Sequence, residues 1–179
     1  MTHQALKDLP KVELHCHLEL AFRKKTLQRW AVEAGMAMEA DHDFAQGFLI
    51  TEPMADLTSV LHKFLNTRDL LDSAAKVEQL TFETCEDMFL VSNVRVLELR
   101  FAPSFLLDAH PHMNADDLLD AILRGVARAE AQYPMAVGLL GLLQRIKSVK
   151  DNTWWCDWIL ERKQHFVGMD LADDEVAFP

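Results

Sequence analysis

Cysteine is rare in this chain and long apolar runs are missing, and both absences narrow the class of protein. The 179 residues include three cysteines, Cys16, Cys85 and Cys156, which are widely spaced and odd in number. A reducing cytosol with free thiols fits this count better than a disulfide framework, so we expect a cytoplasmic protein. No apolar stretch approaches the roughly 20 residues of a membrane span. The first four residues have neither a basic region nor an apolar core, so no secretory signal is visible.

Basic charge is scarce as well. The chain has 18 Lys and Arg against 28 Asp and Glu, which gives a formal net charge of −10. Binding to a nucleic-acid backbone requires a concentrated basic surface. The only basic cluster, Arg23-Lys24-Lys25, is short and has the character of a solvated helix start. We therefore expect a small-molecule partner, and neither nucleic acid nor a membrane.

The apolar pattern predicts alternating strands and helices. Runs typical of buried strands lie at residues 9–19, 94–101, 135–143 and 166–171. Helical spacing is found at 25–35, over 57–92 as two helices with a break near 66–69, at 115–132 and at 152–163. Residues 36–50 are irregular in pattern. This order is typical of βα units in a parallel sheet.

Two architectures fit that order, an open doubly wound sheet and a (β/α)8 barrel. A doubly wound nucleotide fold requires a Gly-rich turn after the first strand, and none follows residue 15. A complete barrel needs about 250 residues, and only four strands are visible. We therefore predict an α/β fold of the (β/α)8 TIM-barrel type with only about the first four βα units. It would form a single domain over residues 1–179, with a helical insertion at 36–92 after the first strand.

Two histidines close the first strand. Side chains alternate across a strand, so His15 and His17 point the same way and converge, whereas Cys16 points to the opposite face. Two neutral imidazoles held in this way form half of a zinc or iron site. His110-Pro111-His112 repeats the spacing, but it falls in a predicted loop, where we expect surface residues.

Four stretches of the chain agree with the strand signatures of one family. Residues 9–18 (LPKVELHCHL) resemble a first strand with a zinc-binding H-x-H, and residues 96–107 (VLELRFAPSFLL) resemble a second strand with the pattern E-x-R-x-x-P. Residues 142–145 (LLQR) are a weaker match to a third strand, and residues 167–175 (VGMDLADDE) are similar to the fourth-strand signature G-x-D-L-A-G-x-E. In order and spacing the sequence resembles the adenosine deaminase family, a branch of the metal-dependent amidohydrolases.

The resemblance implies a barrel with one zinc that hydrolyses the 6-amino group of a purine nucleoside. In it, His15 and His17 match the two first-strand zinc ligands, and Glu19 matches an acidic residue that contacts the sugar hydroxyl. Asp170 matches a fourth-strand aspartate, which we expect to support the ligands without binding the metal itself. Phe64 lies in the helical segment that covers the purine pocket in this family, although a role in the core is the alternative. A bound zinc lowers the pKa of water from ~15.7 towards ~7, which supplies a nucleophile near neutral pH.

The remaining parts of the family's site are a third histidine, a zinc-bound aspartate and a catalytic glutamate on strands five to eight. No H-x-G-E motif occurs in this chain. We therefore expect no catalytic general acid or base here, because these groups would lie beyond Pro179.

Three positions depart from the family's pattern. Glu19 stands where Asp is usual, Leu20 where Gly is usual, and Asp173 where a glycine backbone N–H holds the purine ring. Glu is one methylene longer than Asp, Leu adds bulk, and a carboxylate beside a purine nitrogen changes the choice of hydrogen bonds. Adenosine, adenine and modified 6-aminopurines therefore all remain open as substrates.

Three functional classes follow. The first is an adenosine-deaminase-like aminohydrolase, of which this chain is the N-terminal half. We expect this half to be inactive alone, because it offers two histidines and catalytic zinc sites use about three protein ligands. The second is a non-catalytic truncated or split fragment that binds a complementary half. The third is another H-x-H metal hydrolase, and the second and fourth strand signatures count against it. Zinc is implied by the resemblance, and iron and manganese stay open as metals for a histidine-rich site. Exposed strand edges lead us to expect association with a missing half or with a second copy.

Overall fold

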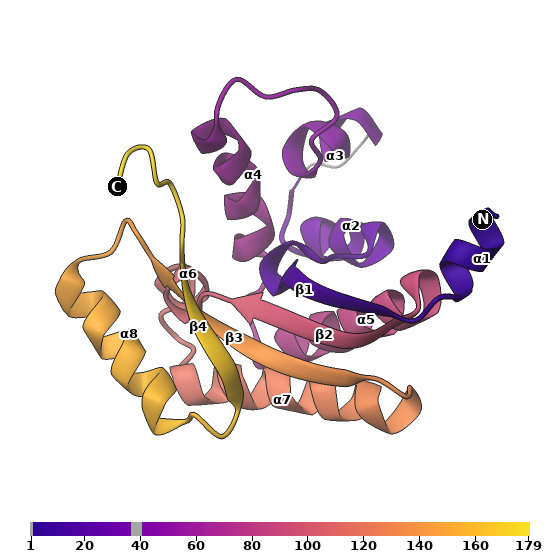
Figure 1. The fold of residues 1–179 in the computed structure, drawn as a ribbon. Coiled ribbons are helices and arrows are strands. Elements are labelled where there is room, and N and C mark those ends of the chain that lie inside the picture. Colours follow the sequence, from indigo (N-terminus) through magenta and orange to yellow (C-terminus); the bar gives the residue numbers. More distant parts are fainter. Residues whose placement is uncertain (1, 37–40) are drawn as a thin grey trace.

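The computed structural model describes residues 2–36 and 41–179. Four parallel strands form one sheet in the order β1-β2-β3-β4, so each strand pairs with the next along the chain. The strands are β1 (Lys11–His17), β2 (Val94–Phe101), β3 (Ala136–Gln144) and β4 (Phe166–Ala172). Successive parallel neighbours joined by helices are the arrangement of a (β/α)8 barrel, as the sequence predicts (Figure 1).

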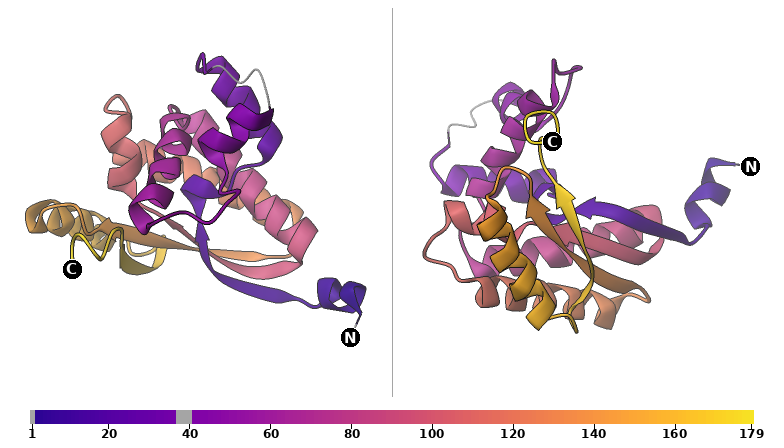
Figure 2. Two further views of the ribbon diagram at one scale, coloured as in Figure 1. Left: turned by 90° about the horizontal axis from the view of Figure 1, so that it is seen from above. Right: turned by 60° about the vertical axis from the view of Figure 1, so that its left-hand side comes forward.

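Helices occupy most of the chain between the strands. They are α2 (Lys24–Glu33), α3 (Asp41–Phe48), α4 (Leu57–Asp69), α5 (Ala74–Ser92), α6 (Pro103–Ala109), α7 (Ala115–Gln132) and α8 (Val149–Glu161). The helix α1 (His3–Asp8) precedes β1, and the 3-10 turn η1 (Leu18–Leu20) follows directly after it. Figures 1 and 2 show α1 projecting away from the body of the molecule, whereas α2, α3 and α4 gather near the end of β1.

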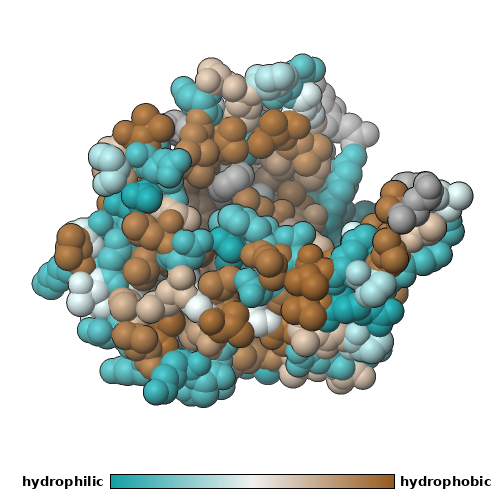
Figure 3. All heavy atoms as spheres, viewed as in Figure 1, coloured by the Kyte–Doolittle hydropathy of each residue, from teal (hydrophilic) through white to brown (hydrophobic). Residues whose placement is uncertain are grey.

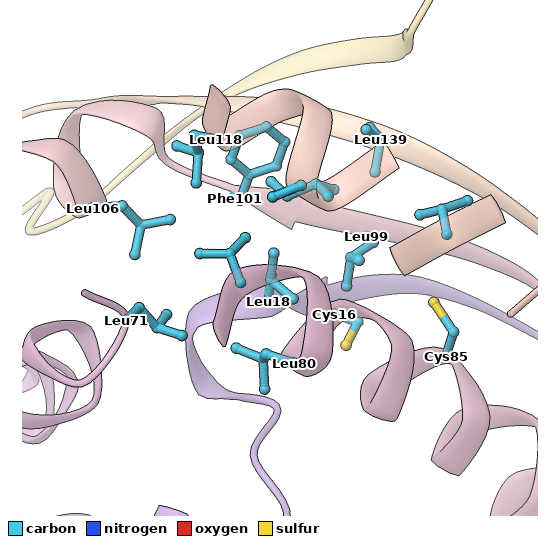
Figure 4. Packing of buried hydrophobic residues seen from close by; sticks show 14 of the residues in the cluster. Cys16, Leu18, Leu71, Leu80, Cys85, Leu99, Phe101, Leu106, Leu118 and Leu139 are labelled. Atoms are coloured by element: carbon cyan, nitrogen blue, oxygen red, sulfur yellow. The ribbon is translucent and has the colours of Figure 1, made fainter. Parts of the chain in front are cut away.

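One face of the sheet packs on α5 and α7. Cys16, Leu99 and Phe101 point from the strands into this layer and meet Leu80 of α5 and Leu118 of α7 (Figure 4). All of these side chains are almost completely buried. Burial of apolar surface at ~25 cal/mol per Å2 therefore holds the strands and the two long helices together as one layered unit.

The opposite face, which we call the open face, carries Arg100 and Asp170 and is not covered by helices α5 and α7. It also exposes apolar side chains from three strands, among them Val12, Val96 and Val167. Figure 3 shows brown, hydrophobic side chains at the surface of the molecule in the view that looks onto the strands. A strand face of this composition is normally buried, because monomeric proteins rarely expose large contiguous apolar patches.

Three helices were not predicted from the pattern. Residues 36–50 include α3, the chain begins with α1, and α6 begins at Pro103, where we expected only the end of a strand. Proline suits the first position of a helix, since its missing N–H is not needed there. His110 therefore follows a helix and is buried, with Nε2 3.0 Å from the Arg68 carbonyl oxygen, so its expected surface position was wrong. No helix in the described part of the chain is long and apolar enough to cross a membrane.

Candidate metal and substrate site

The predicted histidine pair lies at the carboxyl end of β1. The Nε2 atoms of His15 and His17 are 3.3 Å apart, and their ring centroids are separated by 5.2 Å. Burial, the neighbouring His15 ring and the Arg100 guanidinium lower the pKa of His17 to about 4. His17 is therefore neutral at pH 7 and has a nitrogen lone pair available. Cys16 points into the core, as predicted from the alternation of the strand.

The geometry of the pair fits a zinc ion. Two nitrogens bound to one tetrahedral Zn2+ at ~2.0–2.1 Å are separated by about 3.3–3.4 Å. The observed separation of 3.3 Å between the two Nε2 atoms matches this value. Within residues 2–36 and 41–179, no group of three His, Cys, Asp or Glu side chains comes together to hold a metal ion. The described residues thus offer two ligands of the roughly four that a zinc site needs.

Glu19 follows the pair in the turn η1. Its side chain is buried, and Oε1 accepts a hydrogen bond of 2.6 Å from the backbone N–H of Ala102 at the end of β2. Burial raises the pKa of this carboxyl to about 7, although the hydrogen bond from Ala102 acts in the opposite direction. The site therefore contains a carboxyl group whose pKa lies near neutral pH.

Asp173 lies in the loop after β4, where its backbone has a φ of 105°, a conformation that favours glycine. Its Oδ2 accepts a hydrogen bond of 3.1 Å from Gln144 Nε2, and its Oδ1 accepts one of 2.9 Å from the N–H of Asp174. Gln144 is buried at the end of β3 and accepts a hydrogen bond of 2.8 Å from the Ser104 hydroxyl. The loop after β4 is thus tied to β3 and to α6.

Asp170 lies on β4, three residues before Asp173, and forms an ion pair with Arg100. Arg100 Nη1 donates to Asp170 Oδ2 over 2.8 Å, and Oδ1 of the same carboxylate accepts a hydrogen bond from the N–H of Leu171. Asp170 therefore contacts the guanidinium of β2 on the open face. Its charge also raises the pKa of His17, against the larger lowering by burial. Its expected role as a support for the histidines stays a prediction.

A cavity of about 340 Å3 opens beside the histidine pair. It lies between η1, α4, the start of α6 and the loop after β4, and Figure 2 shows the C-terminal segment rising towards the helices that follow β1. Its walls include His17, Glu19, Leu61, Leu65, Phe105 and Asp173. The cavity brings three of the predicted site residues together, and its volume is in the range of small-molecule pockets.

Phe64 belongs to α4, the helix that provides one wall of this cavity, but its side chain is outside the described part of the structure. Leu61 and Leu65 of the same helix line the cavity. The predicted covering segment therefore lies beside the site, and the contribution of Phe64 itself stays a prediction.

Sequence reasoning assigned no role to Arg100 and Gln144, two buried polar residues of the site. Both stand in stretches that carry the family resemblance, at residues 96–107 and 142–145. The signal that could have found them is a polar residue near the carboxyl end of an otherwise apolar strand. In a barrel, that end carries the functional site.

Comparisons with known proteins agree with this arrangement. The family model for adenosine deaminase matches residues 10–179. An adenosine deaminase from Clostridium perfringens is 30% identical over 178 residues, which cover 96% of this chain and 52% of that protein. The chain thus spans about half the length of the curated relatives that it matches.

Solved structures show the same relation. A zinc-bound amidohydrolase from Burkholderia ambifaria superposes with a TM-score of 0.85 and 25% identity over 100% of this chain and 49% of its own. The N6-methyl-AMP deaminase of Arabidopsis thaliana superposes with a TM-score of 0.76 and 25% identity over 97% of this chain and 52% of its own. The chain therefore belongs to the adenosine deaminase family, and it corresponds to the N-terminal half of that family's barrel.

Proposed function

We propose that this chain is half of a zinc-dependent aminohydrolase that removes the 6-amino group of adenosine or a related 6-aminopurine. The observation that carries the proposal is the 3.3 Å separation of the His15 and His17 Nε2 atoms beside a cavity of about 340 Å3. His15 and His17 would hold the metal, whose chemistry is to make a water molecule nucleophilic. Family membership favours this function over another class of H-x-H hydrolase.

The chain's own residues would bind and orient the purine. Leu61, Leu65 and Phe105 form an apolar wall suited to a planar base, and the carboxyl groups of Glu19 and Asp173 line the same cavity. A carboxylate accepts hydrogen bonds, so these two groups would receive N–H or O–H donors of the base or sugar. We expect Phe64, on the same helix as the two leucines, to add to the wall.

The charge of the residues that line the cavity bears on which substrate it accepts. Four acidic residues line the cavity, Glu19, Asp108, Asp173 and Asp174, against one arginine, Arg68. Asp108 is paired with Lys147, and acidic residues still outnumber basic ones among the residues that line the cavity. Arg68 is already paired with Asp69 over 2.8 Å. An excess of carboxylates repels a phosphate group, so this half of the site favours an uncharged base or nucleoside, although the Arabidopsis neighbour is an N6-methyl-AMP deaminase.

We further propose that the 179-residue polypeptide is inactive alone and requires a complementary half. Two imidazoles are fewer than the three protein ligands typical of catalytic zinc, and the general acid and base would come from the other half. The open face and the edges of β1 and β4 are the surfaces that such a half would cover, because relatives of known structure are about twice as long.

The test compares the chain alone with the chain co-expressed with the second half of the Clostridium perfringens relative. We expect no ammonia release from adenosine, adenine or AMP by the chain alone. The co-expressed pair should contain one zinc and release ammonia from at least one of the uncharged purines. A folded, zinc-loaded pair without deaminase activity would contradict the proposed reaction. Activity in the isolated chain would contradict the requirement for a second half.

The matched variant for this experiment is the double substitution His15→Ala and His17→Ala. Under the proposal it abolishes both zinc uptake and ammonia release, while a chain with Trp154→Ala, which alters an exposed side chain of α8 far from the histidines in sequence, retains both. Zinc uptake that survives loss of both histidines would place the metal elsewhere.

A further inference from the structure

Strand β1 contains a β-bulge at the histidine pair. Glu13 pairs with Leu97 and Cys16 pairs with Leu99, so three steps along β1 match two steps along β2. The extra residue leaves Leu14 and His15 without partners in the register of the two strands. A bulge bends its strand and redirects side chains. The direction in which His15 points is therefore set by the geometry of this bulge.

Two charged side chains satisfy the backbone groups that the bulge releases. Glu13 Oε1 accepts a hydrogen bond of 2.8 Å from the backbone N–H of His15. Arg100 Nη2 donates a hydrogen bond of 3.0 Å to the carbonyl oxygen of Leu14. Both contacts, which we call the bulge clamp, thus hold the same peptide group, the one that joins Leu14 to His15.

Arg100 is itself fixed. It pairs with His17 in the register of β1 with β2, so both residues lie at the same level of the open face. Its residue surface is 7% exposed, and Nη1 is anchored by the 2.8 Å hydrogen bond to Asp170 of β4. A guanidinium presents its donors in a rigid planar fork, so an anchor on one nitrogen also orients the other. Asp170, Arg100 and the bulge form a chain of contacts from β4 to β1.

We infer that Arg100, oriented by Asp170 and assisted by Glu13, is a positioning residue for the histidine pair. It holds the β1 bulge in the form that brings the two Nε2 atoms to the separation required by one metal ion. The inference rests on the proposed metal site and adds residues that act on the metal through the ligands. These contacts resemble the hydrogen bonds that commonly orient metal ligands from outside the coordination sphere, whose loss typically costs ~10–100-fold in metal affinity.

Electrostatics and positioning predict opposite signs for one substitution. Arg100→Met removes a positive charge close to the pair, and on electrostatic grounds alone a metal cation would then bind more tightly. If Arg100 instead positions the pair, the same substitution weakens binding. The variant should fold, because Leu14 and the Asp170 side chain are 55% and 48% exposed and water can replace the lost partner.

The experiment measures Zn2+ binding by the 179-residue chain with calorimetry, together with urea unfolding of the metal-free protein. We expect Arg100→Met to weaken Zn2+ binding about 10–100-fold while the unfolding midpoint of the metal-free chain changes little. Arg95→Met is the matched control, because it removes the same group from the same strand and its hydrogen-bond partners are Asn93 and the Pro134 carbonyl. Its Zn2+ affinity should stay within about twofold of the unsubstituted chain.

Two conservative pairs separate hydrogen bonding from charge. Glu13→Gln keeps an oxygen acceptor for the His15 N–H and should bind Zn2+ like the unsubstituted chain, whereas Glu13→Ala should bind less tightly. Asp170→Asn should likewise retain affinity that Asp170→Ala loses, and this second pair tests the clamp even if Arg100→Met does not fold.

The outcomes distinguish this inference from the proposed function. Unchanged or tighter Zn2+ binding by Arg100→Met, or equal losses within each conservative pair, would overturn the positioning role and leave the metal site standing. Zn2+ binding that survives the substitution of both His15 and His17 by alanine would overturn the metal site and the inference together. Zn2+ binding that is absent from the unsubstituted chain would overturn the inference that the bulge prepares the pair for a metal, and the zinc content of the co-expressed pair then tests the metal site separately.

Discussion

Protonation of Glu19 should have a measurable effect on the stability of this chain. The residue is 4% exposed, and its carboxyl accepts a hydrogen bond from the N–H of Ala102. Burial raises the pKa of the group from its ordinary value of 4.5 to about 7. The folded chain therefore binds this proton more tightly than the unfolded chain does. The stability that results is fully present below about pH 4.5 and is lost as the pH rises through about 7.

The size of the loss follows from the two pKa values. A change from 4.5 to about 7 in the pKa of Glu19, at ~1.4 kcal/mol for each pH unit, amounts to about 3 kcal/mol at pH values well above 7. Domains of this kind are stable by only ~5–15 kcal/mol. One buried carboxyl thus accounts for a measurable part of the free energy of unfolding.

The assay is urea unfolding of the unsubstituted chain and of Glu19→Gln at about pH 5 and about pH 8.5. Glutamine retains an oxygen that accepts from Ala102 but does not titrate, so the other ionisable groups contribute equally to both proteins. We expect the variant's advantage in the free energy of unfolding to grow by about 2–3 kcal/mol between the two pH values. Glu161→Gln, which removes an exposed carboxyl, should show no such growth. Parallel pH profiles for Glu19→Gln and the unsubstituted chain would refute the reasoning.

Three further predictions concern packing, backbone strain and thiols. Gly125→Ala should destabilise the chain by about 1–3 kcal/mol in urea unfolding, because a Cβ there would lie 2.7 Å from a backbone oxygen of α5; an unchanged midpoint would show that the two helices separate easily. Asp173→Gly should be more stable than Asp173→Ala by about 1 kcal/mol, since both lose the same hydrogen bonds but only alanine is strained at a φ of 105°. Burial raises the pKa of Cys16 to about 11 and of Cys85 to about 12, so an aromatic disulfide reagent should modify only the partly exposed Cys156 in the folded chain. Two or three rapidly reacting thiols at native pH would contradict that burial.

The strands and their parallel order could be predicted because apolar runs of strand length are a local signal. The strands β2 and β4 lie within one residue of the predicted ranges, 94–101 and 166–171. The helices α3 and α6 were missed because their signals are ambiguous in isolation. A proline can mark the end of a strand or the first residue of a helix. From the sequence alone we interpreted Pro103 as the end of a strand, whereas it is the first residue of α6.

The direction of the first strand's side chains shows where alternation fails. Strict alternation places Val12, Leu14 and Cys16 on one face, yet Val12 and Leu14 are 60% and 55% exposed while Cys16 is 7% exposed. The bulge between Glu13 and Cys16 resolves the difference, because one extra residue reverses the faces of the strand beyond it. A bulge depends on pairing with β2 and on the Arg100 contact to Leu14, and neither is encoded in the local pattern of β1.

The half-complete histidine site has a thermodynamic consequence for assembly of the proposed enzyme. If His15 and His17 supply two ligands and a second half supplies the rest, the metal binds the assembled barrel more tightly than it binds this chain. Linkage then requires that the metal strengthen association by the same factor. The bulge clamp affects the metal affinity of the chain and of the assembled barrel. In both, a pair already held at 3.3 Å loses less conformational freedom when the metal binds. Weakening the clamp should therefore lower the Zn2+ affinity of the chain and of the assembled barrel by similar factors. The zinc dependence of association is the ratio of these two affinities, so it should change little, and association without zinc should stay unchanged.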